Sequence, residues 1–145
     1  MVPGEWVSGN YFSVLEVNAH IGRTLTAGDD RPPGNPVAVL SYGYWRRRFG
    51  ADPAVVGKTI RVHGQPLTIV GVTSPEFLGV GVGYSPAILV PWAVAPLLRP
   101  LVNDWNPLDD PAWNLTHYHS GFLHLLGRLK PGISFQQAEK SLQPL

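Results

Sequence analysis

The stretch that decides the fold is PVAVLSYGYWRRRFGADPAVVGKTIRVHGQPLTIVGV, residues 36–72. It opens with an apolar run of strand length, and Ser41 follows where a helix N-cap is expected. Tyr42, Trp45 and Phe49 then recur at spacings of three and four, which predicts a short helix with one aromatic stripe. We expect this stripe to pack against the preceding strand.

The second half of the same stretch predicts a helical turn and a hairpin. A glycine ends the helix, and Asp52 then caps a turn that has proline at its first position. Apolar and polar side chains alternate over residues 59–62, which indicates a half-buried strand. A His-Gly pair leads into a further strand over residues 67–72, so we expect Gly64 to have a positive φ in a two-residue turn.

Length and composition exclude several classes of protein. A chain of 145 residues is the size of one domain and can bury a core. Its 11 Lys and Arg nearly balance 10 Asp and Glu, so the chain lacks the excess of positive charge that is typical of nucleic-acid-binding proteins. The sequence has no cysteine, which excludes disulfides and thiolate metal ligands. These observations favour one compact, nearly neutral domain.

Residues 77–98 carry no charge, and an uncharged stretch of about 20 residues ordinarily suggests a membrane span. Three glycines and three prolines interrupt it, and such irregular backbone is not tolerated where lipid surrounds it. The stretch therefore predicts a glycine loop followed by a buried strand over residues 87–90. The loop lacks the following helix that a phosphate-binding loop needs, and the sequence contains no GxxxxGK[ST], so we expect no ATP hydrolysis by this chain.

Histidines and carboxylates suggest a metal site only weakly. His117 and His119 would share one face of an extended segment, and Asp109 and Asp110 precede them. His124 falls at an odd separation from both and would point the other way in an uninterrupted strand. Hydrogen-bonded loop histidines are the favoured interpretation, and we expect neither a metal nor a cofactor.

The remaining acidic residues and histidines are interpreted as structural and not catalytic. Asp29 and Asp30, with Glu16, could suggest acid–base chemistry, but adjacent residues in a turn do not share a cleft. They are expected to cap and solvate that turn. His20 and His63 are interpreted as ordinary turn residues, and no nucleophile–base arrangement is recognisable.

Arg46, Arg47 and Arg48 form the strongest local run of charge. On a helix they spread over about 200° of arc and flank the aromatic stripe. A solvated helix face is the favoured interpretation. The alternative is that Arg46 and Arg47 contact an acidic partner surface or lipid headgroups.

Several blocks of the chain together resemble a known family. They occur in the family's order, while residues 97–122, rich in tryptophan and proline, have no match. The matching blocks span residues 7–17, 22–30, 36–60, 67–77, 87–95 and 126–142. With these blocks the sequence is similar to the MacB-like periplasmic core domain, the extracytoplasmic part of FtsX-type ABC transporter permeases.

The chain pattern predicts an α+β fold of short, mostly antiparallel and hairpin-connected strands with a few short helices. The resemblance implies one extracytoplasmic domain fragment over residues 1–145. Residues 7–122 would form an inserted β-rich lobe, and residues 123–145 a strand and helix returning to a membrane-proximal α/β lobe. The family's membrane helices would lie outside both ends, so we expect Met1 to begin an excised, soluble piece of a membrane-attached protein.

The resemblance also implies a function and a location. The chain would be a non-catalytic periplasmic domain of an inner-membrane permease, coupling conformational change across the membrane to export or to an envelope partner. Its partners would be a second permease protomer, a cytoplasmic ABC ATPase and an outer envelope protein. The alternative is a secreted carbohydrate- or peptide-binding module, because Trp105 and Trp113 could stack on sugars or prolines. In either case these two indoles are the predicted partner contacts.

Overall fold

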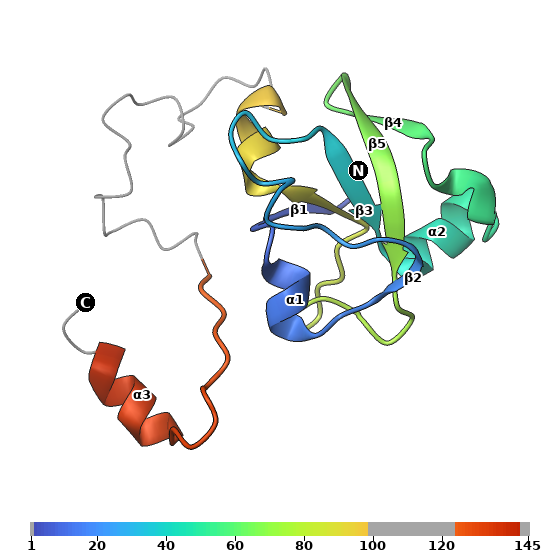
Figure 1. Cartoon of the computed structure of the whole chain (residues 1–145). Helices are drawn as coiled ribbons and strands as arrows, with labels where there is room; N and C mark the ends of the chain where they lie inside the picture. The colour runs from blue at the N-terminus through green and yellow to red at the C-terminus, as the bar shows by residue number, and fades with distance from the viewer. Residues whose placement is uncertain (1, 99–123, 143–145) are drawn as a thin grey trace.

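A computed structural model of the chain describes residues 2–98 and 124–142. Within these ranges it is a mixed α/β structure in which a sheet is flanked by short helices (Figure 1). The elements follow one another as β1 (Gly4–Val7), α1 (Tyr11–Leu15), β2 (Ala19–Gly22), β3 (Val37–Leu40), α2 (Tyr42–Phe49), η1 (Pro53–Val55), β4 (Thr59–Val62), β5 (Gln65–Thr73), β6 (Ile88–Pro91), η2 (Trp92–Leu97) and α3 (Phe135–Leu142).

The described strands form one six-stranded sheet in the order β1-β6-β3-β5-β2, with β4 also paired to β5. Pairs β2·β5, β3·β6 and β4·β5 are antiparallel, whereas β1·β6 and β3·β5 are parallel. The expectation of mostly antiparallel strands is confirmed. The expectation of mostly hairpin connections is wrong, because β4–β5 is the one hairpin in the described sheet and the other neighbours are distant in sequence.

The local predictions for the opening stretch are confirmed. The Ser41 side chain accepts a hydrogen bond from the Tyr44 N–H, and α2 ends at Gly50 in the left-handed conformation. The Asp52 side chain caps η1 by accepting a hydrogen bond from the Ala54 N–H. Gly64 has a φ of +80° beside His63 at +49°, the two positive values that a tight hairpin of this kind requires.

The core lies on both faces of the central strand β3. Ala38, Val39 and Leu40 are fully buried. Leu40 packs in one cluster with Trp45 of α2, and Ala38 packs with η2. Val39 belongs to a separate cluster with Phe12 of α1. Successive side chains of a strand point to opposite faces, so α1 covers the face opposite to α2 and η2.

The structure corrects the interpretation of His20, which was expected in a turn. It lies in β2, and its ring centroid is 5.0 Å from that of Tyr42 and 5.5 Å from that of Trp45. The strand β2 has only four residues, AHIG, which is too short for apolar alternation to reveal it in the sequence. Near His20, the backbone of β5 approaches the residue that follows β2 closely. A Cβ added at Gly71 of β5 would lie 2.1 Å from the Arg23 carbonyl oxygen.

The C-terminal described segment contains a helix but no strand. Helix α3 begins with the expected capping box: the Ser134 N–H donates to Gln137 Oε1 and the Gln137 N–H to Ser134 Oγ, at 2.8 and 3.2 Å. Residues 124–130 pair with no described strand. A strand needs a partner that supplies ladder hydrogen bonds, and none of the six described strands borders this segment. The division into two lobes stays a prediction.

Candidate functional site

Most of the chemically suggestive residues lie outside the described ranges. Trp105 and Trp113, and with them the binding-module hypothesis, remain predictions from the sequence. The same holds for the metal hypothesis, whose residues His117 and His119 are also outside. Within residues 2–98 and 124–142, no group of three or more His, Asp or Glu side chains is arranged to hold a metal ion.

The arginines of α2 have different surroundings in the structure. All three are exposed, as the solvated-face interpretation requires. The Arg46 guanidinium lies 5.9 Å from the centroid of the Tyr42 ring, a cation–π contact within its own helix. Arg47 instead borders a groove between α2 and the glycine-containing loop of residues 74–87. Of the two arginines predicted as partner contacts, Arg47 is therefore the one placed at a concave surface.

This groove has a volume of about 510 Å³. Residues of helix α2 and of loop 74–87 line it, together with Val2 and Pro3. Hydrophobic side chains dominate the lining, which also includes one guanidinium and two serines. The residues lining it are Val2, Pro3, Ser41, Gly43, Tyr44, Arg47, Pro75, Phe77, Leu78, Ser85 and Ala87.

Buried anchors hold the α2 wall in place. The Trp45 side chain is 4% exposed, and its Nε1–H donates to the Asp52 carbonyl oxygen at 2.9 Å. At the start of the helix, the Tyr42 N–H donates to Thr73 Oγ1 at 3.3 Å. The helix is thus fixed to β5 and to the turn that follows it, so the Arg47 side chain projects from a rigid support.

The opposite wall is an apolar loop with exposed hydrophobic side chains. Leu78 is 68% exposed, and Val82 is fully exposed. The Tyr84 hydroxyl donates to the Gly4 carbonyl oxygen at 3.1 Å and ties the loop to β1. Isolated exposed hydrophobic residues are ordinary, but several on one short loop indicate a contact surface. Sequence analysis identified the loop but not the helix it faces.

Phe77 also lines a second cavity of different charge. Its ring packs 5.9 Å from that of Phe12 and 6.2 Å from that of Tyr11. The second cavity has a volume of about 390 Å³, and the carboxylates of Glu16 and Glu76 are among its lining groups. Phe77 therefore lines both the groove bordered by Arg47 and the cavity bordered by Glu16 and Glu76.

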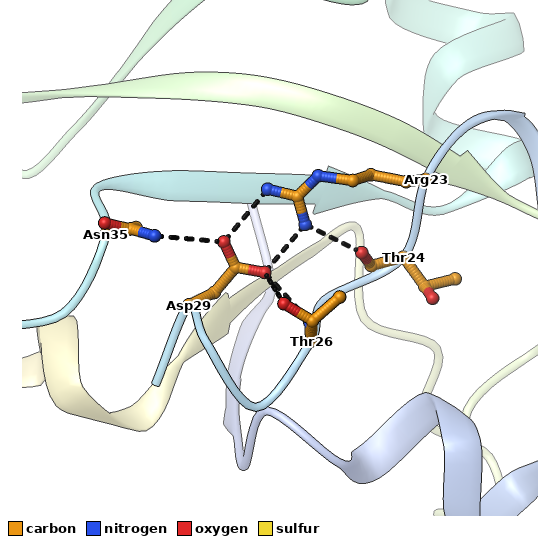
Figure 2. Close-up of polar contacts among 5 residues, drawn as sticks. All are labelled: Arg23, Thr24, Thr26, Asp29 and Asn35. Carbon is orange, nitrogen blue, oxygen red and sulfur yellow. Dashed lines mark hydrogen bonds and ion pairs between the residues drawn. The ribbon is translucent and has the colours of Figure 1, made fainter. Parts of the chain in front are cut away.

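Asp29 is the best-connected polar side chain in the described part of the chain (Figure 2). It forms a bidentate ion pair with Arg23 at 2.7 and 2.9 Å. It also accepts hydrogen bonds from the Thr26 N–H and hydroxyl at 2.8 and 2.9 Å and from Asn35 at 3.3 Å. The Arg23 guanidinium, together with the hydrogen bonds from Thr26 and Asn35, holds the pKa of the Asp29 carboxyl well below its usual range.

The structure corrects the expectation that this aspartate pair solvates a turn. Asp29 is 2% exposed. Asp30 accepts hydrogen bonds from the Ala93 N–H at 2.8 Å and the Gly9 N–H at 3.2 Å. The pair thereby joins the loop between β2 and β3 to η2 and to the turn before α1. Both carboxylates thus accept hydrogen bonds from other parts of the chain, and this network holds the loops of the fold together.

The segment of residues 124–142 exposes most of its hydrophobic side chains. Leu125 is 95% exposed, and in α3 Phe135 is 73% exposed. Its described polar contact with the sheet body is through Arg128, which pairs with Glu16 and donates to the Val14 carbonyl oxygen at 2.7 Å. Figure 1 shows α3 apart from the sheet. No helix within the described ranges has the length and hydropathy to cross a membrane.

Comparison with known proteins gives a family and a fold. The model of the MacB-like periplasmic core domain family matches residues 1–145. The periplasmic region of MacB from Actinobacillus actinomycetemcomitans is similar in structure, with a TM-score of 0.61 and 21% identity over 97% of this chain. The extracellular domain of the noncanonic ABC-type transporter YknZ from Gram-positive bacteria has a TM-score of 0.53 and 22% identity over 66% of this chain.

This chain spans about half of each of these two structures, 53% and 46% of their lengths. At such identities the likeness shows the fold. Among curated proteins, none matches the chain.

Proposed function

Since this chain belongs to the family of MacB-like periplasmic core domains, the extracytoplasmic domains of MacB/FtsX-type ABC transporter permeases, we propose that it couples conformational change in its permease to export or to an envelope partner. In this proposal the permease resides in the inner membrane and the domain works on its periplasmic side without catalysing a reaction. The family match over the whole chain carries the proposal.

The sequence contains no phosphate-binding motif, which fits a domain that does not itself hydrolyse ATP. A P-loop needs GxxxxGK[ST] between a strand and a helix, and the chain has no such run. In this proposal, ATP is hydrolysed by a cytoplasmic ABC ATPase and not by residues 1–145. The permease would work with a second copy of itself, so that the two periplasmic domains move relative to each other.

We propose two sets of side chains as contacts for partners outside the membrane. Trp105 and Trp113 are the predicted aromatic anchors for a neighbouring subunit or an outer envelope protein, because buried indoles commonly dominate interface energetics. The exposed hydrophobic side chains of α3 are the second set. A helix with one apolar face gains stability by burying that face, and this favours its docking on another part of the permease.

Deletion of the domain tests coupling directly. A permease lacking residues 2–142 should still bind its ATPase subunit, because that contact is cytoplasmic, but should lose export or stimulation of the envelope partner. Replacement of Trp105 and Trp113 together by alanine should weaken complex formation while ATPase binding persists. Full activity after the deletion would overturn the proposal.

A further inference from the structure

We propose that the groove between α2 and loop 74–87 binds a single anionic amphiphile, with its acidic head at the Arg47 guanidinium and its hydrocarbon chain along Phe77 and Leu78. This assignment goes beyond the proposed function. A domain that fails to bind such a ligand can still couple a permease, and a chain that binds it need not belong to a transporter. An experiment can therefore contradict the ligand site without contradicting the proposed coupling function, and the reverse.

The guanidinium of Arg47 supplies the charge. Among the described residues, Arg23 and Arg128 each pair with a carboxylate and Lys58 pairs with Asp52. Other exposed cations, such as Arg48 and Arg61, have no carboxylate partner among these residues but lie outside the groove. Arg47 has no carboxylate partner among the described residues, and the residues lining the groove include no Asp or Glu. Arg47 is the one Lys or Arg among the lining residues of the groove, so the groove favours a ligand with one acidic group.

Gly43 shapes this end of the groove. A Cβ at this position would lie 3.1 Å from Arg47 Nη1. The guanidinium is therefore folded back over the first turn of α2, beside Gly43, which itself lines the groove. The absence of a side chain at Gly43 lets the charge lie at the groove and not only in the surrounding solvent.

The rest of the lining is suited to hydrocarbon. Pro75, Phe77 and Leu78 line the groove from the loop, and Val2 and Pro3 add further apolar surface. The volume of about 510 Å³ is within the range of small-molecule sites, roughly 300–1,000 Å³. A largely apolar lining with one charge at its border matches a molecule that has one charged head and one apolar chain.

The backbone at the groove favours an amphiphile over an extended peptide. A peptide that adds to a sheet edge needs free N–H and C=O groups. The Ala87 N–H already donates to the Pro3 carbonyl oxygen at 2.8 Å, and the Ser41 N–H donates to the Ala87 carbonyl oxygen at 2.9 Å. These backbone groups beside the groove are thus occupied, which favours binding through side chains.

Titration calorimetry of the 145-residue chain with dodecanoate below its micelle concentration tests the proposal. We expect saturable binding with one ligand per chain. Arg47→Met keeps the apolar stem but removes the charge, so it should weaken dodecanoate binding by about tenfold while leaving dodecanol binding unchanged. Arg48→Met is the matched control, since it removes the same charge from the same helix outside the groove, and it should change affinity by less than about twofold.

Leu78→Asn should weaken dodecanoate and dodecanol alike, because it replaces hydrocarbon on the loop wall. Equal losses in Arg47→Met and Arg48→Met would show unspecific attraction to positive charge and overturn the site. Equal affinity for dodecyltrimethylammonium, or absence of saturable dodecanoate binding, would also overturn it. Tighter, Arg47-dependent binding of a short peptide of leucines ending in aspartate would replace the amphiphile with a peptide partner and contradict the assignment.

Discussion

Helices α2 and α3 are equally long, eight residues each, and both begin after a serine that caps the first turn. Their surroundings differ completely. Helix α2 buries Trp45 against the sheet, whereas α3 has no buried residue and exposes Phe135 and Leu142. Local sequence signals thus start both helices, but only α2 has a tertiary partner within the described structure.

The difference shows what each helix contributes to stability. Short isolated helices are marginal in water, so most helical stability comes from packing of an apolar face. Helix α2 is therefore part of the cooperative fold, while α3 has an apolar face that the described residues do not cover. The two helices provide matched sites for substitution.

The largest effect is expected from the two aromatic anchors. Trp45→Ala should lower the free energy of unfolding by about 3–5 kcal/mol, because it removes a buried indole and leaves a cavity. Phe135→Ala in α3 should change it by less than about 0.5 kcal/mol, because that ring is mostly exposed. Urea unfolding monitored by circular dichroism measures both. Similar losses for the two variants would show that α3 packs as firmly as α2.

An intermediate effect is expected from the Asp29 network, which stabilises the sheet body but does not touch α3. Asp29→Asn should cost about 1–3 kcal/mol, since it weakens hydrogen bonds to a buried carboxylate while the half-exposed Arg23 regains water. Thr24→Ala is a control in the same loop, because Arg23 contacts its backbone carbonyl oxygen and not its side chain.

The same ion pair predicts how stability depends on pH. The pKa of Asp29 is lowered in the folded chain, so the unfolded chain takes up this proton first as the pH falls. The stabilisation should be complete above the ordinary aspartate pKa of about 4 and decline below it. Denaturant midpoints measured between about pH 6 and pH 2 should fall less steeply in Asp29→Asn than in the native chain. Identical slopes would contradict the role assigned to Asp29.

The smallest effect concerns the two capping serines. Ser41→Ala should cost about 1 kcal/mol in the unfolding of the whole domain, because α2 unfolds with the sheet. Ser134→Ala should leave that free energy unchanged and instead increase amide hydrogen exchange in α3 alone. A global loss in both variants would show that the two helices unfold as one unit.

Sequence predicted the elements whose signals are local. The strand before Ser41, the helix that it caps, the turn at Gly64 and the capping box at Ser134 all depend on neighbouring residues. These features were confirmed because caps, turns and periodicity act over a few positions. Strand partners were not predictable in this way, and the parallel pairs β1·β6 and β3·β5 replaced the expected hairpins.

The candidate site was predictable only in part. The arginine run and the uncharged glycine loop were both noticed, but nothing in the sequence indicated that Arg47 and Leu78 border one groove. The burial of Asp29 was missed for a similar reason, since its partners Arg23 and Asn35 are six residues away on either side in an irregular loop. Contacts set by tertiary structure leave no periodic signal in the sequence.

The central claim is that this domain belongs to a working ABC permease, and co-purification tests it most directly. The permease carrying this domain should be tagged, extracted in mild detergent and analysed for bound subunits. We predict that a cytoplasmic ABC ATPase co-purifies with it in a fixed ratio and that the domain is cleaved by protease only from the periplasmic side. Recovery of the domain as a free secreted protein without an ATPase subunit would contradict the claim.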